Sequence, residues 1–156
     1  MAADFTAKKV MRSGEYRVFR IVETVLKSNP AGRRVFAQTA LGEVIESKDR
    51  VAHSAINSKR VDVIVIDWNG LPLVAIEYQG EGHYQGSAAA RDAVKKEALR
   101  RAGVQYVEVM NHHSDEDVAR LAREALERAA RANAGPSPTP GSPAPAPEVR
   151  IDPESR

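Results

Sequence analysis

The sequence contains no cysteine among its 156 residues. This absence excludes a disulfide-bonded scaffold, a zinc site with thiolate ligands and a cysteine nucleophile. Long hydrophobic runs are also missing, since the longest, residues 71–76, is far shorter than the roughly 20 residues of a membrane-spanning helix. The first ten residues include no apolar segment of the kind found in secretion signals. We therefore expect a cytoplasmic protein that does not associate with membranes.

Aromatic residues are few, with three Phe, four Tyr and one Trp. So few aromatic rings argue against a surface on which bases of single-stranded nucleic acid stack. The net charge of +2 is unevenly distributed, because residues 1–60 hold 12 basic and 6 acidic residues whereas residues 61–156 hold 11 and 15. A basic half suits a surface that attracts a polyanion, although an uneven solvated surface without a ligand is the simpler explanation.

Residues 134–156 form a proline-rich tail that holds seven of the nine prolines. With almost no large apolar side chains, this tail cannot offset the entropy lost on ordering by burying surface. We expect it to be disordered or extended, and either inert or able to dock a protein partner. The folded domain is then residues 10–133, a length typical of one domain.

Hydrophobic periodicity predicts the element order α-β-β-β-α-β-α. We expect Ser13 to cap the first helix and Ser114, with Asp117, to cap the last in a capping box. Residues 48–59 lack a clean period and indicate a loop or a short helix. The expected helices are 14–27, 87–102 and the segment after Ser114, and the expected strands are 34–45, 61–67, 71–79 and 104–110.

Asn69-Gly70 separates two apolar strands and is a strong hairpin signal. An antiparallel meander followed by a helical crossover to a further strand predicts an α/β fold, with a mixed sheet flanked by helices.

The hairpin brings polar side chains together at its open end. Glu77 and Gln79 are two residues apart on a strand and therefore point to the same face, which Leu73 and Ala75 should share. Asp62 begins the partner strand, so hairpin geometry places it near Glu77 or Gln79. The alternative is that Asp62 bonds to a turn and Glu77 occupies an exposed position of the pleat.

Glu15 precedes Val18 and Phe19 by three and four residues and lies at the top of the apolar stripe of the first helix. A carboxylate on the buried side of a helix needs a partner, a cation or a water. Asp62 and Glu77, with Glu15 in support, suit a hard divalent cation such as Mg²⁺ or Mn²⁺. Such an ion polarises a phosphoryl oxygen and activates a water.

Asp62, followed by Glu77-Tyr78-Gln79 on the return strand of a hairpin, resembles the PD-(D/E)XK nuclease superfamily, also called restriction-endonuclease-like. Glu15, Gln38 and the segment Gly80-Glu81-Gly82-His83 are most similar to its very-short-patch-repair endonuclease-like branch, which includes uncharacterised bacterial domains. The resemblance covers about residues 13–126.

The resemblance implies a restriction-endonuclease-like core and Mg²⁺-dependent hydrolysis of phosphodiester bonds, in DNA rather than RNA, in repair, mobile-element or defence processes. Asp62 and Glu77 match the two acidic ligands, and Glu15 matches a supporting helix glutamate. Val61 stands where the motif often has proline, and Gln79 stands where it usually has the lysine of the active site.

A basic residue elsewhere could replace that lysine, because stabilising the attacking group needs only a cation within reach. Lys59, Lys95 and Lys96 are the candidates, and we assign the role to Lys96, with His83 as a phosphate contact or general acid. The basic residues expected to contact the nucleic-acid backbone are Lys59, Arg60, Lys95, Arg33 and Arg34.

Two other functions fit the same residues. The first is a nucleic-acid-binding module of this fold that does not cleave, which the missing motif lysine favours. The second is an interaction domain whose proline-rich tail recruits a protein partner.

Overall fold

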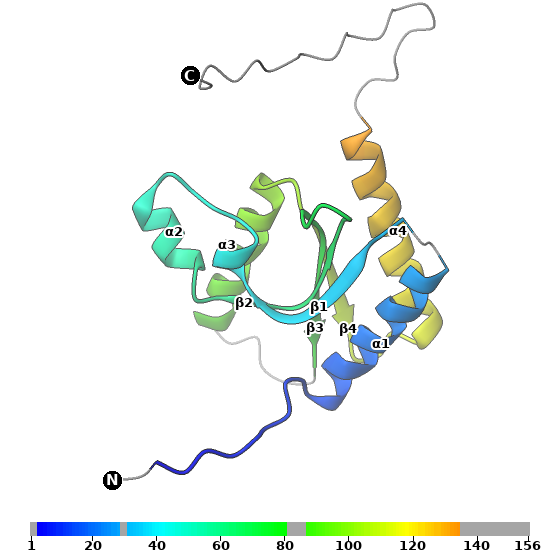
Figure 1. Cartoon of the computed structure of the whole chain (residues 1–156), viewed down its shortest axis with the longest axis horizontal. Coiled ribbons are helices and arrows are strands. Elements are labelled where there is room, and N and C mark those ends of the chain that lie inside the picture. The colour runs from blue at the N-terminus through cyan, green and yellow to red at the C-terminus, as the bar shows by residue number, and fades with distance from the viewer. Residues whose placement is uncertain (1–2, 29–30, 81–86, 135–156) are drawn as a thin grey trace, which may run out of the picture.

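A four-stranded sheet lies between two layers of helices (Figure 1). The structure is a computed structural model that describes residues 3–28, 31–80 and 87–134. The proline-rich tail beyond residue 134 and the predicted site residue His83 lie outside the described residues. The elements are α1 (Ser13–Lys27), β1 (Arg34–Ala40), the 3-10 helix η1 (Leu41–Glu43), α2 (Arg50–Ile56), β2 (Arg60–Ile66), β3 (Pro72–Gln79), α3 (Ser87–Arg101), β4 (Gln105–Met110) and α4 (Asp115–Asn133).

The strand order is β1-β2-β3-β4, with the first two pairings antiparallel and the β3–β4 pairing parallel. The parallel pair is joined through α3, as a crossover connection requires. The predicted meander, crossover and mixed sheet flanked by helices are thus confirmed. None of the helices in the described part of the chain combines the length and apolar character needed to cross a bilayer.

Both faces of the sheet are buried, because β2 and β3 are apolar on both sides. Val63 and Ile76 pack with α1 and α4 in one cluster, while Ile64 and Ala75 pack with Leu99 of α3 in a second. This explains why β2 and β3 are continuous apolar runs rather than alternating ones. The helices contribute the stripes expected from the sequence: the buried residues are Val18, Val22, Val25 and Leu26 in α1, and Val118, Ala122, Ala125, Leu126 and Ala129 in α4.

The helix starts confirm one predicted cap and correct another. Ser114 caps α4, and its hydroxyl accepts from the Asp117 N–H while the Asp117 carboxylate accepts from the Ser114 N–H. The prediction for Ser13 was wrong, because Arg12 has the extended backbone of the N-cap and Ser13 is already helical. Glu15 fixes this start by accepting a hydrogen bond of 2.9 Å from the Arg12 N–H.

The strand predicted over residues 34–45 ends earlier, at Ala40. The fully buried Leu41 starts η1 there, and its N–H donates to the Lys59 carbonyl at 2.7 Å. For residues 48–59 the short-helix alternative is confirmed by α2, whose N-cap Asp49 accepts from two backbone N–H groups.

A bulge in β3 also corrects the expected placement of Leu73. Val65 pairs with Val74 whereas Ile66 pairs with Pro72, so Leu73 is an extra residue in its strand. Leu73 packs in the α1–α4 cluster and not with Ala75 on the opposite face.

Candidate functional site

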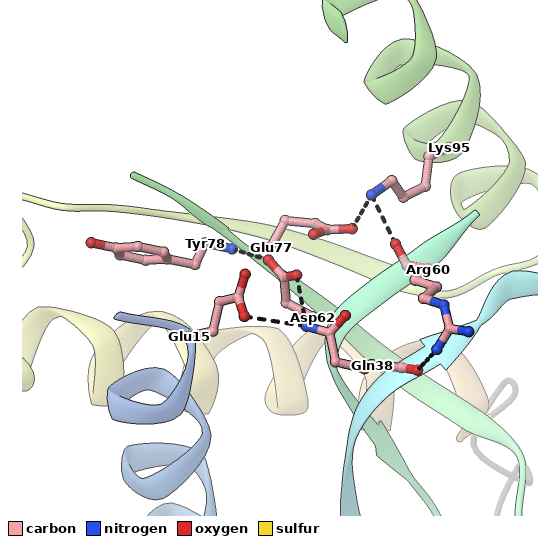
Figure 2. A network of polar contacts seen from close by, with 7 residues as sticks. All are labelled: Glu15, Gln38, Arg60, Asp62, Glu77, Tyr78 and Lys95. Carbon is pink, nitrogen blue, oxygen red and sulfur yellow. Dashed lines mark hydrogen bonds and ion pairs between the residues drawn. The ribbon is translucent and has the colours of Figure 1, made fainter. Parts of the chain in front are cut away.

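Asp62 and Glu77 lie across from each other on β2 and β3, at the end of the hairpin farthest from its turn. The ladder pairs Val63 with Ile76, so the next position along it brings Asp62 opposite Glu77. Asp62 is held there because its Oδ2 accepts a hydrogen bond of 2.9 Å from the backbone N–H of Tyr78 (Figure 2). The convergence expected from hairpin geometry is therefore present, with Glu77 rather than Gln79 facing Asp62.

Gln38 connects Asp62 to Glu15. It lies opposite Asp62 on β1, between the pairs Ala37–Val63 and Thr39–Val61. Its Nε2 is 3.3 Å from Oδ1 of Asp62 and 3.3 Å from Oε2 of Glu15 (Figure 2). Glu15 thus approaches the carboxylate pair through an amide.

The backbone of Gln38 adopts a φ of 51°, in the left-handed region. That conformation costs an L-residue about 1–2 kcal/mol and is uncommon outside glycine. Such strain persists where the surrounding structure holds it, and it is frequent at functional sites. Here the Gln38 carbonyl accepts from the Arg60 guanidinium at 3.3 Å while its amide bonds to Glu15 and Asp62.

Glu77 is the one buried charged residue among those the structure describes, with 5% of its surface exposed. Its Oε1 lies 2.5 Å from Nζ of Lys95 on α3, which also donates to the Arg60 carbonyl at 2.9 Å (Figure 2). Burial raises the pKa of Glu77 to about 8; the Asp62 carboxylate adds to this increase and Lys95 opposes it. Two facing carboxylates with one ammonium between strand and helix form a site that favours additional positive charge.

The structure corrects the assignment of Lys96. Its Nζ lies 5.5 Å from the centre of the Tyr106 ring, a cation–π distance, whereas Lys95 reaches Glu77. The signal that distinguishes them is the helix phase: Lys95 precedes the fully buried Leu99 by four residues and so shares its face. This spacing was not used to choose between the two lysines, and the Arg60 carbonyl and the Tyr78 N–H were not predicted as partners of the site.

The other predicted residues are less closely connected to the carboxylates. Gln79 is half-buried at the end of β3, on the face of Glu77 by strand alternation. Lys59 is half-buried just before β2, and its carbonyl accepts from Leu41. Arg33 and Arg34 are not brought to the site, because Arg34 pairs with Ile66 at the opposite end of the sheet.

A divalent cation fits the pair Asp62 and Glu77. Mg²⁺ is usually bound by one or two carboxylates, completed by waters and substrate phosphates. The donor set here is of that kind, and the buried Glu77 already takes a cationic partner, Lys95. Within the described residues, no group of three or more His, Asp or Glu side chains could hold a metal ion. Glu15, which was predicted to support the ion, therefore does not complete a site of three carboxylates. It is joined to Asp62 through the Gln38 amide.

Residues 7–129 match the family model described as a protein of unknown function, DUF2726. The chain belongs to the DUF2726 family. The match spans most of the chain and includes every residue of the network in Figure 2.

Two bacterial relatives resemble the chain closely. An uncharacterized protein of Haemophilus influenzae is 49% identical over 104 residues, which are 67% of this chain and 55% of that protein. The uncharacterized protein y4bI of Sinorhizobium fredii is 45% identical over 130 residues, which are 82% of this chain and 94% of that protein. The chain thus spans about half of the first relative and nearly all of the second. No solved structure matches the chain.

Proposed function

We propose that this chain is a metal-dependent nuclease that hydrolyses phosphodiester bonds in DNA, with a restriction-endonuclease-like core of the PD-(D/E)XK type. The observation that carries the proposal is the buried Glu77, which faces Asp62 across the hairpin and contacts Lys95 from the crossover helix. Two carboxylates can hold a divalent cation that activates a water, and an ammonium beside them can stabilise the negative charge that develops in phosphodiester hydrolysis.

In this proposal Asp62 and Glu77 hold Mg²⁺ or Mn²⁺. The bound ion would polarise the phosphoryl group and neutralise its developing charge. Gln79, on the face of Glu77, offers a neutral amide to orient a water or the ion. Glu15 and Gln38 keep Asp62 in position, since the Gln38 amide donates to both carboxylates.

Lys95 takes the place of the motif lysine. The strand position that usually carries this lysine is Gln79, but an ammonium reaches the same carboxylate from α3. A cation held by a helix and a backbone carbonyl is already oriented, so it stabilises negative charge on the attacking oxygen and the phosphate without reorganisation.

The same contact favours one second candidate, a nucleic-acid-binding module that does not cleave. Lys95 occupies Oε1 of Glu77 and compensates its charge. If this ion pair is permanent, the site binds no metal, and the chain would bind nucleic acid through the basic residues around the site.

A titration of the chain with Mn²⁺, measured by calorimetry, distinguishes the two candidate functions. We expect one site in the wild type, lost in Asp62→Asn and Glu77→Gln, and retained in Glu23→Gln, which removes an exposed carboxylate of α1. Melting temperatures show whether the variants fold. The same proteins are then incubated with plasmid DNA and Mg²⁺ or Mn²⁺. No metal binding together with no cleavage of DNA would overturn the nuclease proposal, as would cleavage that persists in both site variants.

A further inference from the structure

A pocket of about 490 Å³ opens beside the carboxylate network, on the side of the N-terminal segment. It is lined by Lys9, Val10, Met11, Arg12, Glu15 and Gln38. Gln38 and Glu15 belong to both the pocket and the network, and the Gln38 amide is 3.3 Å from Asp62. A group bound in the pocket is therefore separated from Asp62 by one side chain.

The two basic residues of the pocket keep their charge available. Lys9 and Arg12 are both exposed, and neither forms an ion pair within residues 3–28, 31–80 and 87–134. Other basic residues differ in this respect: Arg17 pairs with Asp115 and Arg120 pairs with Asp117. Glu15 offsets one of these two positive charges, and its Oε2 accepts hydrogen bonds from the Arg12 N–H and the Gln38 amide.

The segment that carries these two residues is anchored between them. Met11 is 9% exposed and belongs to the core cluster under α1 and α4. The Arg12 N–H is fixed by Glu15 at 2.9 Å. Lys9 and Arg12 are thus attached on either side of a buried residue, so little backbone entropy is lost when they contact a ligand.

We propose that this pocket binds the backbone phosphate next to the phosphate at Asp62 and Glu77. The inference rests on the proposed function, because it takes a nucleic-acid strand as the ligand. Arginine and lysine are the side chains that bind phosphate best, through charge-assisted hydrogen bonds. A nucleic-acid strand carries a phosphate at every nucleotide, and the pocket shares Glu15 and Gln38 with the carboxylate network, so the pocket suits the phosphate that follows the one at Asp62.

The test compares two double variants that remove the same charge. Lys9→Gln/Arg12→Gln removes the basic residues of the pocket, and Arg33→Gln/Arg34→Gln removes two at the opposite end of the sheet. The affinity of the full chain for a fluorescent DNA duplex is measured by anisotropy without divalent cations, at several salt concentrations. We expect the pocket variant to bind at least about tenfold more weakly, because charge-assisted hydrogen bonds to phosphate are lost. Its plot of log affinity against log salt should be shallower by about one, because the contact with one phosphate is lost.

Charge-conserving variants serve as rescue, and we expect Lys9→Arg/Arg12→Lys to keep most of the affinity. If the pocket variant and the Arg33/Arg34 variant bind DNA equally well, the pocket assignment is wrong even when the wild type cleaves DNA. If affinity depends on the pocket but no cleavage or Mn²⁺ binding is found, the nuclease proposal fails and the phosphate pocket remains. Absence of DNA binding by the wild type would overturn the phosphate pocket, whereas the nuclease proposal is decided by Mn²⁺ binding and DNA cleavage.

Discussion

Lys95 and Glu77 form a buried ion pair of 2.5 Å between α3 and β3, with side chains that are 13% and 7% exposed. Removing one partner of such a pair leaves an uncompensated group in a desolvated place. Because Lys95 also donates to the Arg60 carbonyl, the ammonium joins β2, β3 and α3 at one point. The pair is therefore both a structural contact and the chemical centre of the proposed site.

Replacing Lys95 by Met should abolish most of the cleavage activity and leave the neighbouring lysine dispensable. We expect Lys95→Met to lower the rate of DNA cleavage by about 100-fold or more, since a preorganised charge is lost. Lys96→Met is the matched control: it removes only a cation–π contact with Tyr106 and should keep near wild-type activity. Cleavage rates at saturating Mn²⁺ measure the difference, and equal rates for the two variants would exclude Lys95 from the reaction.

The raised pKa of Glu77 predicts a pH dependence of stability in the absence of divalent cations. In the folded state the pKa of the Glu77 carboxyl is about 8, against an ordinary value of 4.5. The folded chain thus binds more protons than the unfolded chain between these values, and this contribution to stability is present below 4.5 and lost as the pH rises to about 8.

Urea unfolding in EDTA from pH 4 to 9 would measure this loss, which should amount to a few kcal/mol for this group. In Glu77→Gln the decline between these pH values should be reduced. If the stability of Glu77→Gln declines with pH as much as that of the wild type, the pH dependence comes from other groups.

The strained backbone of Gln38 allows its structural and site roles to be separated. Gln38→Gly removes the amide that joins Glu15 to Asp62 but accepts a φ of 51° without cost, so stability should change by less than about 1 kcal/mol. Metal affinity or cleavage should fall nevertheless. Gln38→Val, which is β-branched, should be destabilised by about 1–3 kcal/mol. Thermal unfolding measures the effect on stability, and Mn²⁺ titration measures the effect on the site. Full activity in Gln38→Gly would exclude a role for the amide.

Gly14 is required by the close approach of Tyr78. A Cβ at Gly14 would overlap the Tyr78 ring and lie 2.8 Å from its hydroxyl oxygen. We expect Gly14→Ala to be destabilised by about 1–3 kcal/mol, because the ring or α1 must shift. Gly80→Ala is the control, since its Cβ would meet the same ring at an ordinary 3.5 Å. Chemical unfolding of both variants measures this, and equal stability would show that the ring moves without cost.

Periodicity and turn chemistry were sufficient to predict most of the fold. The apolar stripes of α1 and α4, the Asn69-Gly70 hairpin and the crossover through α3 all depend on local pattern, and each is present. Ser13 was assigned wrongly because residue type alone favours serine as a cap, whereas Glu15 fixes the Arg12 N–H through a side chain three residues later.

The site was predictable only where it follows from strand pairing. Asp62 and Glu77 face each other as hairpin geometry requires, and this needed no knowledge of tertiary structure. Lys95, the Arg60 carbonyl and the Gln38 amide depend on how α3 and β1 pack on the hairpin. No pattern along one strand contains that information, although the four-residue spacing of Lys95 from the buried Leu99 indicates its direction.

The bulge at Leu73 determines which side chain faces Asp62, although it lies near the other end of the hairpin. If Leu73 instead paired with Val65, so that the register of Ile66 with Pro72 continued unbroken, Asp62 would face the apolar Ile76, and Glu77 would move one position beyond it. A shift of one residue also moves each side chain to the other face of the sheet. The alignment of the two carboxylates therefore depends on Leu73 staying out of the ladder. Deleting Leu73 would let Val74 follow Pro72 in an unbroken ladder and leave Asp62 opposite Glu77, whereas drawing Leu73 into the ladder would separate the two carboxylates without touching either of them.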